Sequence, residues 1–130
     1  MAVKKLPQIL VINGPNLNML GIREPKIYGR ETLRDVEALC VKTGKELRLN
    51  VACKQSNHEG EIVTWIQQSR KEFQGIIING GALSHTSIAI LDALKLVKLP
   101  VIEVHISNIF ASENIKIGRA SCRERVCLAV

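Results

Sequence analysis

The chain has 130 residues, of which 46% are hydrophobic and 23% are charged, so it is long enough to form one globular domain with a sizeable core. No apolar run approaches the roughly 20 residues of a membrane helix, and the N-terminus has no apolar signal-peptide segment, so we expect a cytoplasmic protein with no membrane partner. The net charge of +6 is concentrated partly in residues 116–130, and only 3% of the chain is aromatic. Because a nucleic-acid groove needs clustered cations and stacking aromatics, no nucleic-acid partner is expected.

The four cysteines predict neither a disulfide framework nor a metal site. Cys40 and Cys53 fall in segments with apolar periodicity and are expected to be buried thiols. Cys122 and Cys127 lack C-x-x-C spacing, and no histidine stands near them at metal-ligand spacing. We therefore expect no metal ion.

The first half of the chain predicts a strand, a long loop, a helix and a second strand. Residues 8–13, with an apolar run at 9–12, are predicted to form the first strand. The strand ends at Asn13-Gly14-Pro15, and a polar loop follows up to residue 29. Thr32 can cap a helix that Asp35 stabilises and that Gly44 ends. The helical spacing places four side chains on its inner face: Leu33, Val36, Leu39 and Cys40. Apolar and polar residues alternate over residues 46–55, which predicts a strand. One face of this strand would be more exposed to solvent, as is typical of a strand at the edge of a sheet.

The second half predicts two more helices and two more strands. A helix follows the polar residues 55–61, with an inner face made of Ile62, Trp65, Ile66 and Ser69. The strand at 76–78 stops at Asn79-Gly80-Gly81, Thr86 and Ser87 start the next helix, and residues 101–105 form the last strand of this pattern.

Alternating strands and helices with near-continuous apolar strands predict an α/β fold, a flavodoxin-like doubly wound parallel sheet with helices on both faces. In such sheets, ligands bind beyond the carboxyl ends of the strands. Each polar cluster of the chain follows a predicted strand, at residues 13–28, 55–58, 79–85 and 105–108. We therefore expect one ligand site at that edge.

Two pairs of residues could perform acid–base chemistry there. Tyr28 shares its loop with Arg23, whose guanidinium would favour the phenolate and make it a general base. Glu103 and His105 share one face of a strand, where the carboxylate can orient the imidazole as an acid. A hydrogen-bonded, partly buried tyrosine and a structural histidine remain the alternatives.

The segment 79–87 is a Gly-containing turn into a helix N-terminus, where exposed amides suit an anion. It matches neither G-x-x-x-x-G-K-[ST] nor G-x-G-x-x-G, so no nucleotide is indicated. Ser107 and Asn108 offer further amides after the last strand. The alternative is that Ser84, Thr86 and Ser87 are helix caps and that Asp92 is a helix-surface charge.

Four blocks together resemble the type II 3-dehydroquinate dehydratases: INGPNLNMLGIREPKIYG, QSNHEGEIVTWI, INGGALSHTSIAILDAL and PVIEVHISNI. The resemblance covers roughly residues 8–115 and implies a flavodoxin-like domain over residues 1–115 that assembles as a dodecamer of trimers. It also implies reversible anti elimination of water from 3-dehydroquinate to give 3-dehydroshikimate, without a metal or organic cofactor. Such an enzyme serves aromatic amino acid biosynthesis, through the shikimate pathway, or quinate catabolism.

The resemblance also implies a role for individual residues. Tyr28 would take the proton next to the ketone, Arg23 would stabilise its anion, Asn16 would hold a water against the enolate, and His105, beside Glu103, would protonate the departing hydroxyl. Contacts to the substrate would come from Asn79, His85, Asp92 of a neighbouring subunit, the Ile106–Ser107 amides and Lys116.

Residues 116–130 depart from the family pattern and form an atypical basic tail. Two arginines of the family fall on Ser112 and Lys116, and the family's last strand and helix have no counterpart. We therefore weigh a second hypothesis, a catalytically impaired remnant that binds a small carboxylic acid. A third is an unrelated flavodoxin-like binder of phosphate or nucleotide.

Overall fold

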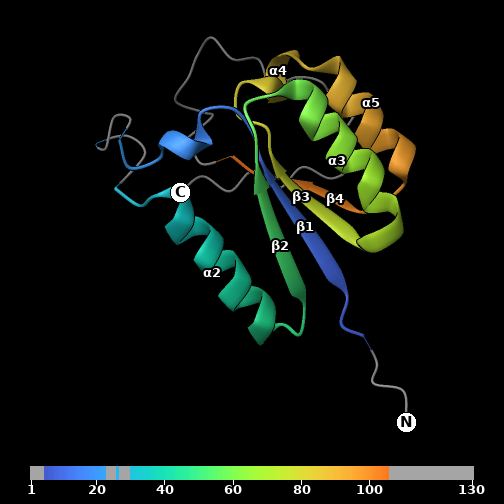
Figure 1. Ribbon diagram of the computed structural model, residues 1–130, viewed down its shortest axis with the longest axis horizontal. Helices are drawn as coiled ribbons and strands as arrows, with labels where there is room; N and C mark the ends of the chain where they lie inside the picture. Colours follow the sequence, from blue (N-terminus) through green and yellow to red (C-terminus); the bar gives the residue numbers. More distant parts are fainter. Residues whose placement is uncertain (1–4, 23–25, 27–29, 106–130) are drawn as a thin grey trace.

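The computed structural model describes residues 5–22, 26 and 30–105, which form a four-stranded parallel sheet in the order β2-β1-β3-β4 (Figure 1). The strands are β1 Gln8–Asn13, β2 Asn50–Gln55, β3 Gly75–Asn79 and β4 Val101–Glu103. The helices are η1 Leu17–Met19, α2 Leu33–Glu46, α3 Glu59–Glu72, α4 Leu83–Thr86 and α5 Ile88–Val97. The predicted α/β fold is confirmed, as is the place of β2 at an edge of the sheet.

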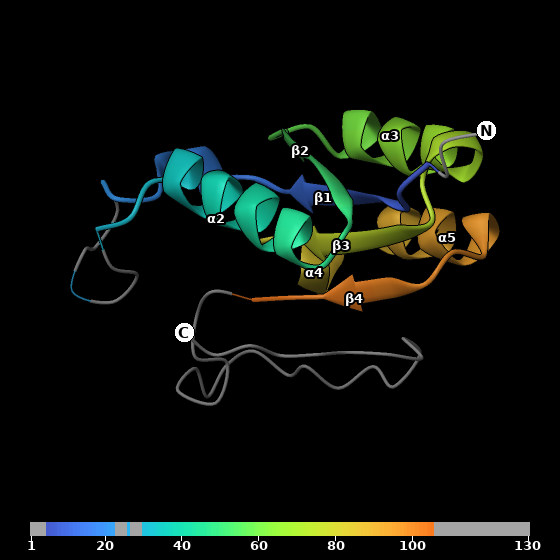
Figure 2. The ribbon, with the colours of Figure 1, turned by 90° about the horizontal axis from the view of Figure 1, so that it is seen from below.

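Helices cover both faces of the sheet, with α2 on one side and α3 and α5 on the other (Figures 1 and 2). The core lies under α3 and α5, where alternate strand residues meet the inner faces of the two helices. Its buried members are Leu10, Ile12, Ile62, Ile66, Ile76, Ile78, Ile90, Ala93 and Val97. The predicted inner face of α3 is confirmed, since Ile62, Ile66 and Ser69 are buried and Trp65 is half-buried.

The helix α2 begins as predicted but ends later than predicted. Thr32 and Asp35 form a capping box, in which each side chain accepts a hydrogen bond from the other residue's backbone N–H. Gly44 does not end this helix, which continues to Glu46, and a turn with Arg48 at φ 58° delays β2 to Asn50. Gly44 is instead a packing residue, because a Cβ there would lie 2.4 Å from Cγ2 of Val51.

The inner face of α2 is only partly covered. Leu39, predicted to face inward, is 63% exposed, because among the described elements α2 stands alone on its face of the sheet (Figure 2). Cys40 and Cys53 are half-buried rather than fully buried. Burial, followed by the charges of Cys40 and Glu37, raises the pKa of the Cys53 thiol to about 11. Burial also raises the pKa of the Cys40 thiol, so both thiols are expected to be weakly reactive at neutral pH.

The predicted start of the helix after β3 is confirmed, because Ser87 caps α5 by accepting a hydrogen bond from the Ile90 amide at 3.0 Å. The short helix α4, which precedes it, was not predicted, and one further boundary differs from prediction. The last strand ends at Glu103 and not at His105. Its partner β3 stops at Asn79, so the ladder closes with the Val104 amide donating to the Ile78 carbonyl at 2.9 Å.

We predict that Gly44→Ala destabilises the domain by about 1–3 kcal/mol, the usual cost of overpacking a closely packed contact. The new methyl would meet the Cγ2 of Val51, and the gain of about 1 kcal/mol in helix propensity cannot offset that clash. Urea unfolding of the two chains measures the difference.

Gly60→Ala is the matched control, because a Cβ at Gly60 in α3 has nothing within 4 Å. It should be neutral or stabilising by up to about 1 kcal/mol. Adding Val51→Ala to Gly44→Ala should recover part of the loss. Equal, stabilising effects of the two glycine substitutions would show that α2 can shift away from β2 at little cost.

Candidate functional site

The carboxyl ends of three neighbouring strands lie at one level, and each ends in an amide side chain. In the sheet register Asn13 of β1 pairs with Gln55 of β2 on one side and with Asn79 of β3 on the other. Parallel partners point to the same face, and neighbouring strands are about 4.8 Å apart. The fold thus builds a row of amides at the edge where the sequence predicted the site.

The turns after β1 and β3 pack backbone against backbone. The Gly14 amide donates to the Asn79 carbonyl at 2.7 Å, and a Cβ on Gly14 would lie 2.6 Å from the Gly80 carbonyl oxygen. Gly81 has φ +56°, and a Cβ there would lie 2.9 Å from the Pro15 carbonyl oxygen. These positions need glycine for close approach, and they fix the Asn16 loop against the turn that leads into α4.

Asn16, the predicted holder of a catalytic water, is exposed and has a left-handed backbone with φ 70°. Its backbone N–H donates to Oδ1 of Asn57 at 3.0 Å. The Gln55 side chain donates to the same oxygen and to the Gly14 carbonyl, both at 3.2 Å. Gln55 and Asn57 thus position Asn16, although the sequence indicated only that they belong to a polar cluster.

Asn79 is buried, and its Oδ1 accepts a hydrogen bond from the Gly81 amide at 3.2 Å. That bond fixes the side-chain carbonyl within the turn, so the amide NH₂ is the group that a ligand oxygen could use. The place of Asn79 agrees with the anion site predicted from the sequence, and its role stays a prediction.

The structure brings three further predicted residues together. Nε2 of His105 lies 2.9 Å from Oε1 of Glu103, and both side chains are largely buried, with 8% and 14% exposed. The ring of His85 stacks on that of His105 with centroids 6.1 Å apart and planes 21° from parallel. A buried carboxylate at hydrogen-bond distance fixes which way the imidazole points, and an imidazole held in one orientation is the arrangement of an acid–base histidine.

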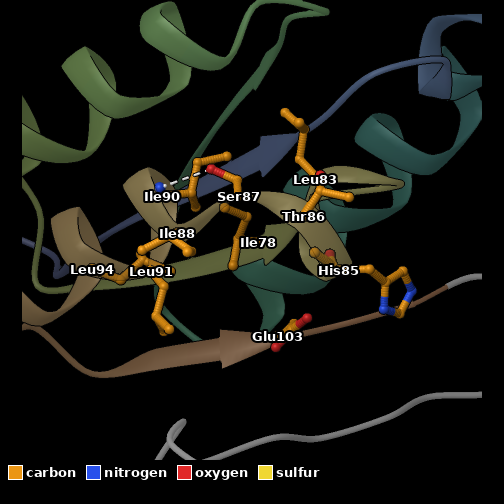
Figure 3. A pocket seen from close by; sticks show the side chains of 12 residues that line it. Ile78, Leu83, His85, Thr86, Ser87, Ile88, Ile90, Leu91, Leu94 and Glu103 are labelled. Carbon is orange, nitrogen blue, oxygen red and sulfur yellow. Dashed lines mark hydrogen bonds between the residues drawn. The ribbon is translucent and has the colours of Figure 1, made fainter. Parts of the chain in front are cut away.

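A pocket opens between β3, β4 and the two helices α4 and α5 (Figure 3). Its floor is apolar, with Leu91 and Leu94 at one end, and His85 and Glu103 lie at the other (Figure 3). The polar end therefore adjoins the histidine pair, and a small polar ligand would bind there rather than on the apolar floor.

Some predicted residues are not brought into this cluster. Asp92 lies exposed on α5 and is not among the side chains that line the pocket. Tyr28, Arg23, Ile106, Ser107 and Lys116 lie outside the described residues. Within residues 5–22, 26 and 30–105, no three His, Cys, Asp or Glu side chains are grouped to hold a metal ion, and no helix could cross a membrane.

Comparison with known proteins identifies the family. The sequence profile described as "Dehydroquinase class II" matches residues 7–130. The chain is 59% identical over 108 residues to a 3-dehydroquinate dehydratase of Prochlorococcus marinus (strain MIT 9301), covering 83% of this chain and 74% of that one.

Solved structures give the same result. A type II dehydroquinase from Butyrivibrio crossotus superimposes with a TM-score of 0.87 and 43% identity, over 95% of this chain and 89% of that one. One from Propionibacterium acnes has a TM-score of 0.86 and 41% identity, over 100% and 90% of the two chains. The chain belongs to the class II (type II) dehydroquinase family. The profile match runs through residues 116–130, so the domain boundary at residue 115 stays a prediction.

Proposed function

We propose that this chain is a 3-dehydroquinate dehydratase, a hydro-lyase that removes water from 3-dehydroquinate to give 3-dehydroshikimate. The observation that carries the proposal is the buried Glu103–His105 pair, 2.9 Å between Oε1 and Nε2, at the sheet edge that also holds the amide row. The names of the relatives supply the substrate.

In this proposal the elimination uses a base and an acid on opposite sides of the substrate ring. Tyr28, kept as its anion by Arg23, removes the proton next to the ketone. Electrons move into an enolate, which a water held by Asn16 stabilises. His105 then donates its proton to the hydroxyl as the C–O bond breaks, and Glu103 stabilises the imidazolium before that transfer.

Binding of the substrate would use groups that do not react. The Asn79 NH₂ and the Ile106–Ser107 amides would hold the carboxylate, and Lys116 would add positive charge. His85, stacked on His105, would contact the ring hydroxyls. Asp92 would act on the site of a neighbouring subunit, which suits its exposed position on α5. Assembly from trimers into a dodecamer and a cytoplasmic location belong to the same proposal and rest on the family resemblance.

A second candidate function rests on the prediction that residues 116–130 depart from the family's pattern, with Lys116 where the family has an arginine. In this case the domain binds a small carboxylic acid without turning it over. Enone absorbance of the product, followed after adding 3-dehydroquinate, separates the two candidates. Turnover supports the enzyme, whereas thermal stabilisation by quinate or citrate without turnover supports the binding protein.

We predict that Tyr28→Phe lowers kcat by about 100-fold or more, since a general base is lost while the ring and its packing remain. KM should change much less. Steady-state kinetics of both proteins, with residues after 115 replaced by a family-like C-terminus, measure the effect. Nearly unchanged kcat would assign the base to another residue.

We predict that His105→Ala and Asn79→Ala fail in different ways. Loss of the acid should lower kcat with little effect on binding of quinate as an inhibitor, whereas loss of the Asn79 NH₂ should weaken that binding by roughly 10-fold or more. Inhibition constants and kcat for each variant test this division of roles. Indistinguishable profiles would contradict it.

We predict that the chain as written assembles poorly and turns over substrate weakly. β4 pairs only with β3 among the described strands, Ile102 on it is 37% exposed, and α2 stands alone on its face. No described strand pairs with the outer edge of β4, and an exposed edge strand with apolar surface promotes association between chains. Lys116→Arg alone should not restore activity, because one planar donor group does not cover a sheet face.

A family-like strand and helix placed after residue 115 should restore both assembly and turnover. Size-exclusion chromatography with the enone assay compares the two chains. A monodisperse oligomer with full turnover from the chain as written would contradict this prediction.

A further inference from the structure

Asn13 is the middle member of the amide row and has no part in the mechanism above. Its side chain is 4% exposed at the carboxyl end of β1. Its Nδ2 is fully buried, yet no described residue accepts a hydrogen bond from it. A buried NH₂ without an acceptor is costly, because it has lost its hydrogen bonds to water and gained none in return.

The two neighbours in the row do have partners. Gln55 donates to the Gly14 carbonyl and to Asn57, and Asn79 accepts from the Gly81 amide. The backbone carbonyl of Asn13 also has a partner, since it accepts a hydrogen bond from the Ser56 amide at 3.0 Å. The deficit is therefore confined to the Asn13 side chain, and it lies one strand away from the NH₂ of Asn79.

We propose that Asn13 is a further ligand-binding residue, whose Nδ2 donates a hydrogen bond to an oxygen of the hydroxy acid held by Asn79. The inference rests on the proposed function for the identity of that acid. Two NH₂ groups about 4.8 Å apart on neighbouring parallel strands can reach two oxygens of one carboxylate, or its carboxylate and a hydroxyl. Asn13 gives no proton in the reaction, so it should act on binding.

The obvious alternative is that Asn13 stabilises the fold, and a nearly isosteric apolar variant separates the two roles. Asn13→Leu removes a donor that has no acceptor in the free protein, so the thermal midpoint of the unliganded variant should stay the same or rise. If the Asn13 amide stabilised the fold, the thermal midpoint of the unliganded variant should fall. Gln55→Leu is the matched control from the same register row, because its NH₂ is hydrogen-bonded, and its midpoint should fall.

The ligand arm uses the full chain and quinate, a hydroxy acid that carries no ketone and does not eliminate. Titration calorimetry should show roughly 10- to 100-fold weaker binding to Asn13→Leu, as expected when one hydrogen bond to a charged oxygen is lost. Asn13→Asp, which replaces the donor by a negative charge, should bind more weakly still at neutral pH. Near-equal affinity of parent and Asn13→Leu would overturn the proposal, and so would a lower thermal midpoint for unliganded Asn13→Leu.

The outcome is separable from that of the enzyme proposal. A parent chain that binds quinate but does not turn over 3-dehydroquinate would end the enzyme proposal and leave the Asn13 comparison intact. A parent chain that does not bind quinate would overturn the Asn13 proposal as well, because no acid would be present for its NH₂ to contact.

Discussion

The site depends on the close approach of two backbones at the ends of β1 and β3. A single hydrogen bond, from the Gly14 amide to the Asn79 carbonyl at 2.7 Å, joins the two turns, and there is no room for a side chain between Gly14 and Gly80. The approach fixes the start of the Asn16 loop relative to the turn that leads to His85. Since each loop carries groups of the proposed site, backbone contact rather than flexible side chains sets the relative position of these groups.

The burial of the Glu103–His105 pair needs a separate explanation. A carboxyl group and an imidazole are kept largely out of water just beyond the end of β4, where the strand ladder has already ended. Removing polar groups from water costs free energy, and one hydrogen bond returns only part of it. The pair is therefore weak evidence for stability. The proposed function explains it better, because a proton donor has to be held in one orientation toward its substrate.

Several features were predicted from the sequence because they depend on local chemistry. The end of β1 follows from Asn13-Gly14-Pro15, and the start of α2 follows from Thr32 and Asp35. Other features depend on contacts that a sequence does not display. Gly44 was misread because a glycine near a helix end can be either a cap or a place where a strand packs closely, and only Val51 decides between them. The end of β4 was misplaced because it is set by where β3 stops.

The row of amides formed by Asn13, Gln55 and Asn79 is another feature that the sequence alone does not display. Asn13, Gln55 and Asn79 are far apart in sequence, and each alone reads as a turn residue after a strand. Only the register makes them neighbours, and only burial reveals that one of the three lacks an acceptor. The family resemblance names Asn79 as a substrate contact, whereas it assigns no role to Asn13, which precedes a Gly-Pro break that is a sufficient local explanation for it. A polar residue that a local turn already explains can therefore have a second role that the sequence does not indicate. For Asn13, the observation that indicates this role is a buried Nδ2 without a hydrogen-bond acceptor among the described residues.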